Sequence, residues 1–473
     1  VKVTKGVIDN CPEDEFVKKL KERPIPKATQ FLLDNNFLGD KSGQGFYRKT
    51  EQRDEKGGRI ILALDLHTLE YKPAQKSMIP IVGIAKKIEI MDRRLKEMVS
   101  SDENSGYFVR DLLCGMMVYA ANRVPEISEN IYSIDNAMKA GYAWSYGPFE
   151  YWDMLGIKET AKLATSLGEM VPAWIQTMID KGIESFYISE NGKRKYYDLS
   201  SGTYQVIPGT ELNIHLDNFR NNAPVYKNSE CILHDIGDGV LCFEFTTKSN
   251  AIGEGIGEGA IEALNIAQNG DWAGIVIGNN AKNFTVGANL MGVAMVAMQK
   301  DFAKFEQMVN GFQQVNMALR YASVPVVTAT QGYVFGGGCE ILMHTDAAVC
   351  HAESYIGLVE VGVGLIPGGG GTKEFALRAS ESFFEGDVQI PTLVEKLKVI
   401  ATATVSTSAY EGFNHGYLQH NRDVVEINLS KVLSTAKSKV LELARNYTAP
   451  VQKEATVLGR GGLGTLYTAL NEF

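Results

Sequence analysis

The chain has 473 residues, of which 45% are hydrophobic and 22% charged, a composition typical of a folded protein rather than a disordered one. Its 47 basic and 56 acidic side chains give a net charge of −9, which argues against a protein that mainly binds nucleic acid or an anionic membrane. No apolar run approaches the ~20 residues of a membrane-spanning helix. We therefore expect a globular protein of about three domains or subdomains, with neither nucleic acid nor a membrane as partner.

Cysteine and histidine usage gives no sign of a metal site. The six cysteines are widely spaced, without a CxxC pair, and the seven histidines form no HExxH motif. We expect free thiols in a reducing compartment, which is why we predict a cytoplasmic protein. The chain opens at Val1 rather than at a methionine, so a targeting signal upstream stays open.

In the first half of the chain, apolar residues recur at three-and-four spacing, as in packed helices. This pattern predicts helices over Asn104–Ala121, Ile127–Gly141 and Lys158–Lys181. The charged, turn-rich stretches Tyr47–Arg59 and Glu190–Gln205 are predicted to be linkers.

From about Cys231 onward, short apolar strands alternate with helices. This alternation predicts an α/β domain whose parallel strands are buried between helices. The expected strands are Gly239–Thr246, Gly274–Gly278 and Pro325–Thr330, and the expected helices are Ala260–Gln268, Val293–Ser323 and Ile341–Asp346.

Three glycines followed by Cys339 and Glu340 come shortly after the predicted strand that ends at Thr330. Glycines at a strand-to-helix junction let a ligand approach the backbone closely, and a helix N-terminus offers unpaired N–H groups to an anion. Glu340 would lie in the first helical turn, beside any group held there. The alternative is that Glu340 only complements the helix dipole and that the glycines serve packing.

A second carboxylate, Glu360, lies in the apolar and glycine-rich stretch 358–372. A carboxyl group between valines either points to solvent or is buried with a raised pKa, and a raised pKa suits a proton-transfer group. Two carboxyl groups that reach one pocket would form an acid/base pair.

A loop of small residues, Asn283–Leu290, follows the predicted strand Gly274–Gly278. Its backbone N–H groups and that of Gly337 would be convergent donors, the arrangement that an oxyanion hole needs. An ordinary surface loop is the alternative.

The segment Gly255–Ala260 fits the pattern G-x-G-x-x-A of dinucleotide-binding loops. The preceding strand is expected to end near Thr246, too far away for the tight turn that this pattern requires. Glu254 and Glu258 would also place like charge beside the phosphates. We therefore do not expect a dinucleotide site here.

Three of these segments together resemble the enoyl-CoA hydratase (crotonase) family. FTVGANL (284–290) resembles the first oxyanion-hole loop of that family, and QGYVFGGGCE (331–340) resembles its second loop with the first catalytic glutamate. LVEVGVGLIPGGGGT (358–372) resembles the segment that bears the second glutamate. The resemblance extends over about 231–473 and implies an α/β crotonase-like domain, a ββα spiral, in that range.

The resemblance implies a role for five residues. The N–H groups of Ala288 and Gly337 would hold the thioester oxygen, and Glu340 and Glu360 would activate water and protonate the α-carbon. The N–H of Gly368 would position that water. The implied reaction is hydration of trans-2-enoyl-CoA to 3-hydroxyacyl-CoA, with an acyl-CoA thioester as substrate and no metal or cofactor in this chain. Isomerases of the family typically rely on the second carboxylate alone, whereas this sequence keeps both, which favours hydration. The alternatives are an enoyl-CoA isomerase of the crotonase fold and a non-catalytic docking fragment.

The first half resembles the helical C-terminal domain of 3-hydroxyacyl-CoA dehydrogenases, in two copies. LGDKSGQGFY (38–47) is similar to the closing motif of one copy, and Ile134–Met138 with Gly147–Glu150 to the middle segment of a second. Catalytic copies read approximately Gly-Phe-x-Val-Asn-Arg where this chain has Gly106–Asp111, with Arg110 in place of the functional Asn. The second copy is therefore expected to be structural.

The implied fold is multidomain, with all-α dehydrogenase C-terminal-type domains followed by the crotonase-like domain. The expected ranges are 1–50 for the end of the first helical domain, 75–185 for the second, 186–230 for a linker and 231–473 for the hydratase domain. The Rossmann domain that precedes these helices in the family is not found in this sequence. NAD is therefore expected only for that missing domain, which would be a partner of the helices. A homo-oligomer is one open alternative for the assembly.

Overall fold

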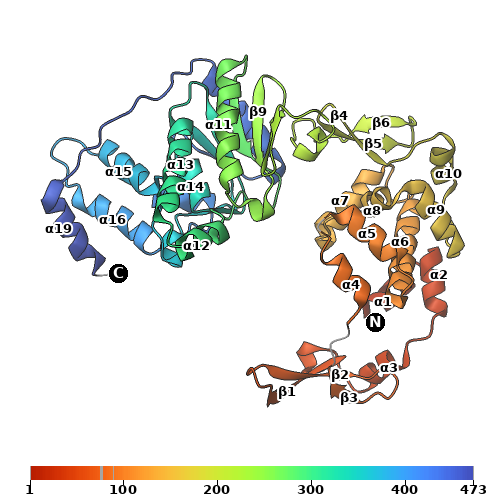
Figure 1. Cartoon of the computed structure of the whole chain (residues 1–473). Helices are drawn as coiled ribbons and strands as arrows, with labels where there is room; N and C mark the ends of the chain where they lie inside the picture. The colour runs from red at the N-terminus through yellow and green to blue at the C-terminus, as the bar shows by residue number, and fades with distance from the viewer. Residues whose placement is uncertain (1, 75–77, 89, 472–473) are drawn as a thin grey trace. The chain divides into compact units, whose positions relative to one another are not determined.

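The computed structural model describes residues 2–74, 78–88 and 90–471, which divide into two compact units (Figure 1). The first unit is Val1–Tyr187 with Tyr197–Thr203, and the second is Ile188–Tyr196 with Tyr204–Phe473. The predicted start of the second helical domain, residue 75, lies outside the described residues.

The first unit is mainly helical. The predicted helices Asn104–Ala121 and Ile127–Gly141 are confirmed as α6 and α7, the second starting four residues later than expected. The predicted helix Lys158–Lys181 is two helices, because Gly168 turns the chain at φ +85° and Pro172 precedes the second one. In chain order the helices are α1 (Lys2–Asn10), α2 (Glu15–Glu22), α3 (Lys27–Asp34), α4 (Pro80–Ala85), α5 (Met91–Ser100), α6 (Asn104–Asn122), α7 (Ile131–Tyr142), α8 (Pro148–Leu155), α9 (Ile157–Ser166) and α10 (Ala173–Asp180).

The segment Tyr47–Arg59, predicted to be a linker, instead begins a small sheet, which also corrects the expectation of all-α domains in this half. β1 (Tyr47–Arg53) pairs antiparallel with β2 (Arg59–Leu64), which pairs with β3 (Tyr71–Pro73). The Asp54 carboxylate closes the turn by accepting backbone N–H groups at 2.8 and 3.0 Å. Almost every β1 side chain is exposed, so the strand lacks the apolar alternation by which a sequence reveals a strand.

The other predicted linker, Glu190–Gln205, also contains regular structure. Strands β4 (Tyr187–Glu190), β5 (Lys193–Asp198) and β6 (Thr203–Val206) form a three-stranded sheet in that order. These strands are short and rich in charged and polar side chains, so no apolar run marks them. The domain boundaries themselves stay a prediction.

The second unit is built on a seven-stranded sheet of order β15-β13-β11-β10-β9-β8-β7. Strands β9, β10, β11, β13 and β15 are parallel, and β8 and β7 extend one edge antiparallel. The three predicted strands are confirmed as β9, β10 and β11, all fully buried as expected of parallel strands between helices. The bounds are β7 (Tyr226–Lys227), β8 (Cys231–Asp235), β9 (Val240–Phe245), β10 (Gly274–Gly278), β11 (Val326–Thr330), β13 (Ala347–His351) and β15 (Val424–Glu426).

Helices cover both faces of this sheet. On one face, α18 (Val432–Ala444) packs its apolar side chains in one cluster with Val276 and Val327. On the other face, α11 (Glu254–Asn269) and α13 (Phe302–Arg320) pack in a second cluster. This cluster also contains the strand residues that alternate with those of the first cluster and so point to the opposite face of the sheet. Residues 255–260 lie inside α11, so they form no phosphate-binding loop, as the sequence indicated.

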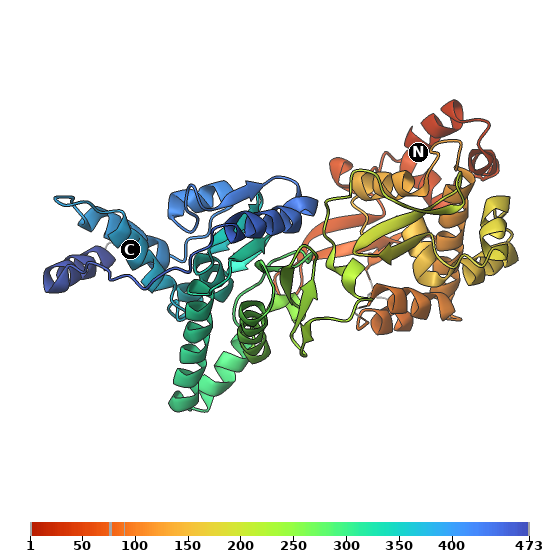
Figure 2. The ribbon, with the colours of Figure 1, turned by 90° about the horizontal axis from the view of Figure 1, so that it is seen from above.

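The predicted helix Val293–Ser323 is also two helices, α12 (Leu290–Met298) and α13. Lys300 has φ +56°, and the Asp301 side chain caps α13 by accepting the Lys304 N–H, so a sharp turn separates the two (Figure 2). The other helices of this unit are α14 (Gly337–Met343), α15 (Gly371–Glu381), α16 (Ile390–Ala401), α17 (Ala409–His415) and α19 (Gly459–Leu470).

The topology places the three segments singled out in the sequence at one edge of the sheet. The loop 279–289 follows β10, the segment 331–336 follows β11, and the segment 352–370 follows β13. Because β10, β11 and β13 are adjacent and parallel, their carboxyl ends meet at the same edge, where α/β sheets commonly bind ligands.

The six cysteines are free thiols, of which five are buried and Cys11 is exposed. Within the described ranges, no group of three or more His, Cys, Asp or Glu side chains is placed to hold a metal ion. Every helix in the described part of the chain is too short or too polar to span a bilayer.

Candidate active site

The two loops predicted to form an oxyanion hole lie side by side. Thr285 in the first loop bridges to Val334 in β12 (Tyr333–Phe335) of the second, and its N–H donates to the Tyr333 carbonyl at 3.0 Å. Gly287 touches the second loop so closely that a β-carbon built on it would lie 3.0 Å from the Phe335 carbonyl oxygen. The backbones of the two loops therefore meet at the residues that immediately precede the two predicted donors, Ala288 and Gly337, in the chain.

Ala288 and Gly337 each present a backbone N–H that the fold leaves unused. Ala288 bridges to Ile252, but the hydrogen bonds of that bridge use the Gly287 carbonyl and the Asn289 N–H. Gly337 is the first residue of α14, where an N–H has no intrahelical acceptor. Among the described residues, neither N–H meets an acceptor. Both are free to donate to a ligand.

Glu340 lies in the first turn of α14 and is only 2% exposed. The Gly371 N–H donates to its Oε1 at 2.9 Å. Burial raises the pKa of Glu340, and hydrogen bonds from the N–H groups of Gly371, Gly369 and Gly370 oppose that rise. A β-carbon on Gly369 would collide with Glu340 Oε2, so the carboxyl group and this loop approach as closely as they do only because the residue is glycine.

Glu360 lies beside the start of α14. A β-carbon built on Gly336, which has φ +52° at the start of α14, would lie 3.2 Å from Glu360 Oε1. The buried Glu360 Oε2 has no hydrogen-bond partner among the described residues. Burial, and then the negative charge of Glu340, raise the pKa of Glu360 to about 7. The two predicted carboxyl groups are thus close enough to influence each other's ionisation.

Gly368, predicted to position water, belongs to a loop that two side-chain amides of α13 hold. Gln313 Nε2 donates to the Gly368 carbonyl at 2.7 Å, and Asn316 Nδ2 donates to the Gly369 carbonyl at 2.8 Å. Neither amide is among the residues predicted from the sequence. The signal available was two amides three residues apart on one predicted helix, which is too common a pattern to be noticed alone.

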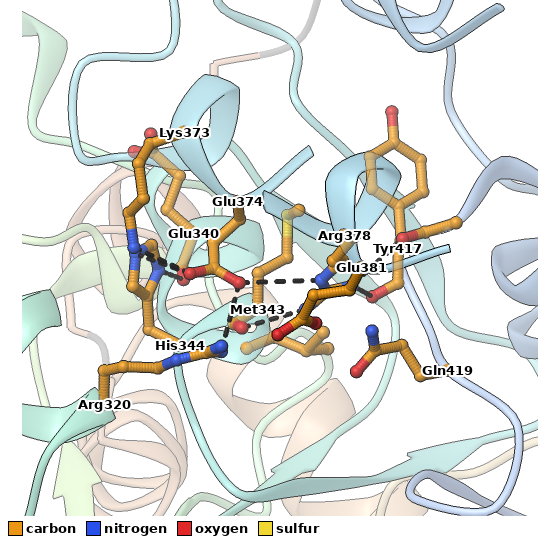
Figure 3. Close-up of polar contacts among 12 residues, drawn as sticks. Arg320, Glu340, Met343, His344, Lys373, Glu374, Arg378, Glu381, Tyr417 and Gln419 are labelled. Atoms are coloured by element: carbon orange, nitrogen blue, oxygen red, sulfur yellow. Dashed lines mark hydrogen bonds and ion pairs between the residues drawn. The ribbon is translucent and has the colours of Figure 1, made fainter. Parts of the chain in front are cut away.

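A buried ion cluster centred on Glu374 lies behind Glu340 (Figure 3). Lys373 Nζ lies 2.7 Å from the Glu374 carboxylate, Arg320 Nη1 lies 3.1 Å from it, and Arg378 Nε lies 3.6 Å from it. This cluster is not predicted from the sequence either, although Lys373 and Glu374 come soon after the glycine run. The Glu374 side chain is fully buried although the neighbouring Lys373 side chain is partly exposed, and the sequence alone does not show which of the two charges lies in the interior.

His344 connects this cluster to the backbone of Glu340 (Figure 3). Its Nδ1 donates to the Glu340 carbonyl at 2.6 Å, and its Nε2 faces Glu374. Burial lowers the pKa of His344 to about 4, so the imidazole is neutral at pH 7. The C-terminal end of α14 is therefore fixed by a neutral side chain within a charged cluster.

In the first unit, the two dehydrogenase-like segments meet at the buried N-terminus of α8. The Asp135 carboxylate accepts the Phe149 N–H at 2.9 Å and the Tyr187 hydroxyl at 2.7 Å. The Glu150 carboxylate accepts the Gly147 N–H at 2.7 Å. A β-carbon on Gly147 would collide with Asp135, which explains a glycine at this position.

Comparison with known proteins assigns two parts of the chain. Residues 236–390 match the family described as enoyl-CoA hydratase/isomerase. Residues 106–197 match the family described as 3-hydroxyacyl-CoA dehydrogenase, C-terminal domain. The second match is to the C-terminal domain of its family alone, and the two matches together support an enzyme.

The chain is 35% identical over 466 residues to a Bacillus subtilis protein named "Probable 3-hydroxyacyl-CoA dehydrogenase", covering 98% of this chain and 57% of that protein. It is 27% identical over 418 residues to a Rickettsia felis protein named "Putative fatty acid oxidation complex trifunctional enzyme", covering 86% of this chain and 52% of that protein. Among solved structures, an enoyl-CoA hydratase from Bacillus anthracis is 17% identical, with a TM-score of 0.39, covering 51% of this chain and 90% of that one.

The chain thus spans about half the length of the curated relatives that it matches. The predicted lack of a nicotinamide-binding domain is not supported by these alignments and stays a prediction. The ββα spiral, and the expectation that NAD belongs only to another domain, also stay predictions.

Proposed function

We propose that this chain adds water to the double bond of a 2-enoyl-CoA thioester and gives a 3-hydroxyacyl-CoA. The observation that carries the proposal is the pair of carboxyl groups of Glu340, which is buried, and Glu360, whose Oε2 is buried; both have a raised pKa and both lie beside glycine-rich backbone. A pair that shares one proton near neutral pH supplies a base and an acid together. The match of residues 236–390 to the hydratase/isomerase family supports the same reading.

Adding water to a conjugated thioester builds negative charge on the thioester oxygen. The N–H groups of Ala288 and Gly337 would donate to that oxygen as it becomes an enolate. Both donors are fixed before the substrate arrives, because the fold holds the two loops against each other. The loss of one such donor in other enzymes costs about 100-fold to 1,000-fold in kcat.

The ionised member of the carboxylate pair would take a proton from water as the water oxygen bonds to the β-carbon. The protonated member would give its proton to the α-carbon, so the pair ends the cycle with the same number of protons. The Gly368 N–H would hold the water in place. The unpaired, buried Oε2 of Glu360 is an acceptor suited to such a water.

The test is the loss of ultraviolet absorbance of crotonyl-CoA, a short 2-enoyl-CoA, when the chain is added. We expect rapid loss with the parent chain and at most a residual rate with Glu340→Gln or Glu360→Gln. Glu353→Gln is the matched control, because Glu353 is exposed on the same segment. A folded chain without activity would contradict the proposal. Turnover of a 3-enoyl-CoA without hydration of the 2-enoyl-CoA would show isomerisation instead.

We also propose that the helical dehydrogenase-type domain is structural in this chain. Arg110, at the position of the family's functional Asn, donates to the carbonyls of Val99 and Ser101 at 2.5 and 2.8 Å and stacks 4.4 Å from the Tyr107 ring. Its guanidinium therefore ties α6 to the end of α5. NADH formation from 3-hydroxybutyryl-CoA by this chain alone would contradict the proposal.

A further inference from the structure

We propose that Gln313 and Asn316 are positioning residues that hold the glycine loop 368–371 in the conformation in which its N–H groups meet Glu340. The inference rests on the proposed hydration and concerns the same site. The two amides lie three residues apart on α13, which places them on one face of the helix. Their targets are successive carbonyls, Gly368 and Gly369.

Holding a carbonyl also orients the N–H on the other side of the same peptide bond, because the peptide group is planar. The amide of Gln313 on the Gly368 carbonyl thus fixes the Gly369 N–H. The amide of Asn316 on the Gly369 carbonyl fixes the Gly370 N–H. Both N–H groups, with that of Gly371, act on the Glu340 carboxylate.

External anchors are needed here because four successive glycines have no side chains of their own to fix them. Glycine has more backbone freedom than any other residue, so such a loop loses the most entropy when it adopts one conformation. Glycine is nevertheless required at 369, since a β-carbon there would collide with Glu340 and with the Phe312 ring. The loop is therefore flexible by composition and held by α13.

The two amides differ in environment, which makes one of them a clean probe. Asn316 is fully buried, and its Oδ1 has no partner among the described residues, so its contact to Gly369 is made by the Nδ2 group. Gln313 is exposed, so its replacement does not disturb the core. Gln314, the next residue, is also exposed, and its amide reaches Asn310 at 3.5 Å instead of the loop.

The test uses the full chain with three uncharged substitutions and one that keeps a donor. Gln313→Met and Asn316→Leu remove the amide donors at similar size, Gln314→Met is the matched control, and Gln313→Lys retains an N–H donor. With crotonyl-CoA we expect kcat to fall roughly 5- to 10-fold in Gln313→Met, about what one lost hydrogen bond produces. A misplaced reacting group can cost ~100-fold, which we expect for Asn316→Leu.

If Gln313 and Asn316 only stabilised the fold, their replacement would not give the pattern that we expect in KM and in the pH profile of kcat. KM should stay within about 2-fold, because the anchors do not touch the parts that bind the thioester. The pH profile of kcat should move to higher pH in both variants, since weaker N–H contacts let the pKa of Glu340 rise. Gln313→Lys should recover most of the rate, and Gln314→Met should match the parent.

Hydrogen exchange at residues 368–371, followed by mass spectrometry, separates this inference from the proposed function. Faster exchange in Gln313→Met and Asn316→Leu but not in Gln314→Met supports the anchoring even if the parent chain proves inactive on enoyl-CoA. Unchanged exchange and unchanged kcat in Gln313→Met, in an active parent chain, would overturn it. Gln313→Met decides the matter if Asn316→Leu fails to fold.

Discussion

The imidazole Nε2 of His344 lies 3.7 Å from Oε1 of Glu374, and both side chains are fully buried. Burial alone would raise the pKa of Glu374, but the charges of Arg320 and Arg378, with the hydrogen bond from Lys373, hold it below its ordinary value. The ionised form of Glu374 is therefore stabilised by the neighbouring cations, and the buried arginine charges are stabilised by Glu374 in turn.

Glu374→Ala should lower the free energy of unfolding of the second unit by ~3–5 kcal/mol, because it leaves buried arginine charge without its partner. The loss is measured by unfolding the chain in urea and monitoring hydrogen exchange in β10 and β11. Glu381→Ala is the control, since Glu381 pairs with the exposed Lys453, a kind of pair worth about 1 kcal/mol or less. Equal losses in the two variants would contradict the central role of Glu374.

Glu360→Gln should make the second unit more stable than the parent at pH 8 and change it little at pH 5. The pKa of Glu360 rises from 4.5 to about 7 on folding, so folding favours the protonated form and stability is lost as pH rises from 4.5 through 7. The gain at pH 8 should be on the order of 2–3 kcal/mol. Thermal unfolding at the two pH values checks this. A gain that is the same at both would show that the carboxyl group ionises freely.

Ala288→Pro should lower kcat about 100-fold to 1,000-fold, because it removes one of the two N–H groups that we propose as donors to the enolate oxygen. The bridge to Ile252 should survive, since its hydrogen bonds use the residues on either side of Ala288. Val286→Pro is the matched control in the same loop, because the Val286 N–H makes no hydrogen bond among the described residues. The rate of crotonyl-CoA hydration is measured for both. A comparable loss in Val286→Pro would attribute the effect to the loop rather than to the donor.

Asp135→Ala should destabilise the first unit by roughly 1–3 kcal/mol, because the Phe149 N–H at the start of α8 loses its buried acceptor. Hydrogen exchange at the start of α8 should accelerate in the same variant. Asp111→Ala, at an exposed position on α6, is expected to leave both measurements unchanged. If both variants behave alike, the dehydrogenase-like segment has another role than starting this helix.

The core of the second unit was predictable from the sequence because its central strands are mostly apolar. Strands such as Gly274–Gly278 are buried on both faces, and such runs carry a signal that does not depend on partners. Strand β1 has the opposite character, with exposed and charged side chains, and its pairing depends on a turn that Asp54 closes. Helix breaks at Gly168 and Lys300 were missed because single residues of positive φ leave the apolar period intact on both sides.

The site could be predicted as far as it consists of local motifs. Glu340 and Gly337 share one short segment, and the resemblance to a known family named Glu360 and Ala288 as well. The anchors on α13 and the ion pair of Arg320 with Glu374 join residues more than 50 positions apart. No local period encodes such contacts, so they became visible only in the folded chain.

Helix α18 has a consequence for how the protein is made. It covers one apolar face of the sheet, and it comes after every strand of that sheet in the chain. During synthesis, the strands that carry the site segments leave the ribosome before their cover does, with Val276 and Val327 facing outward. Until residue 444 has emerged, the nascent chain lacks the helix that covers this apolar face, and we expect chaperones to bind the chain in this interval.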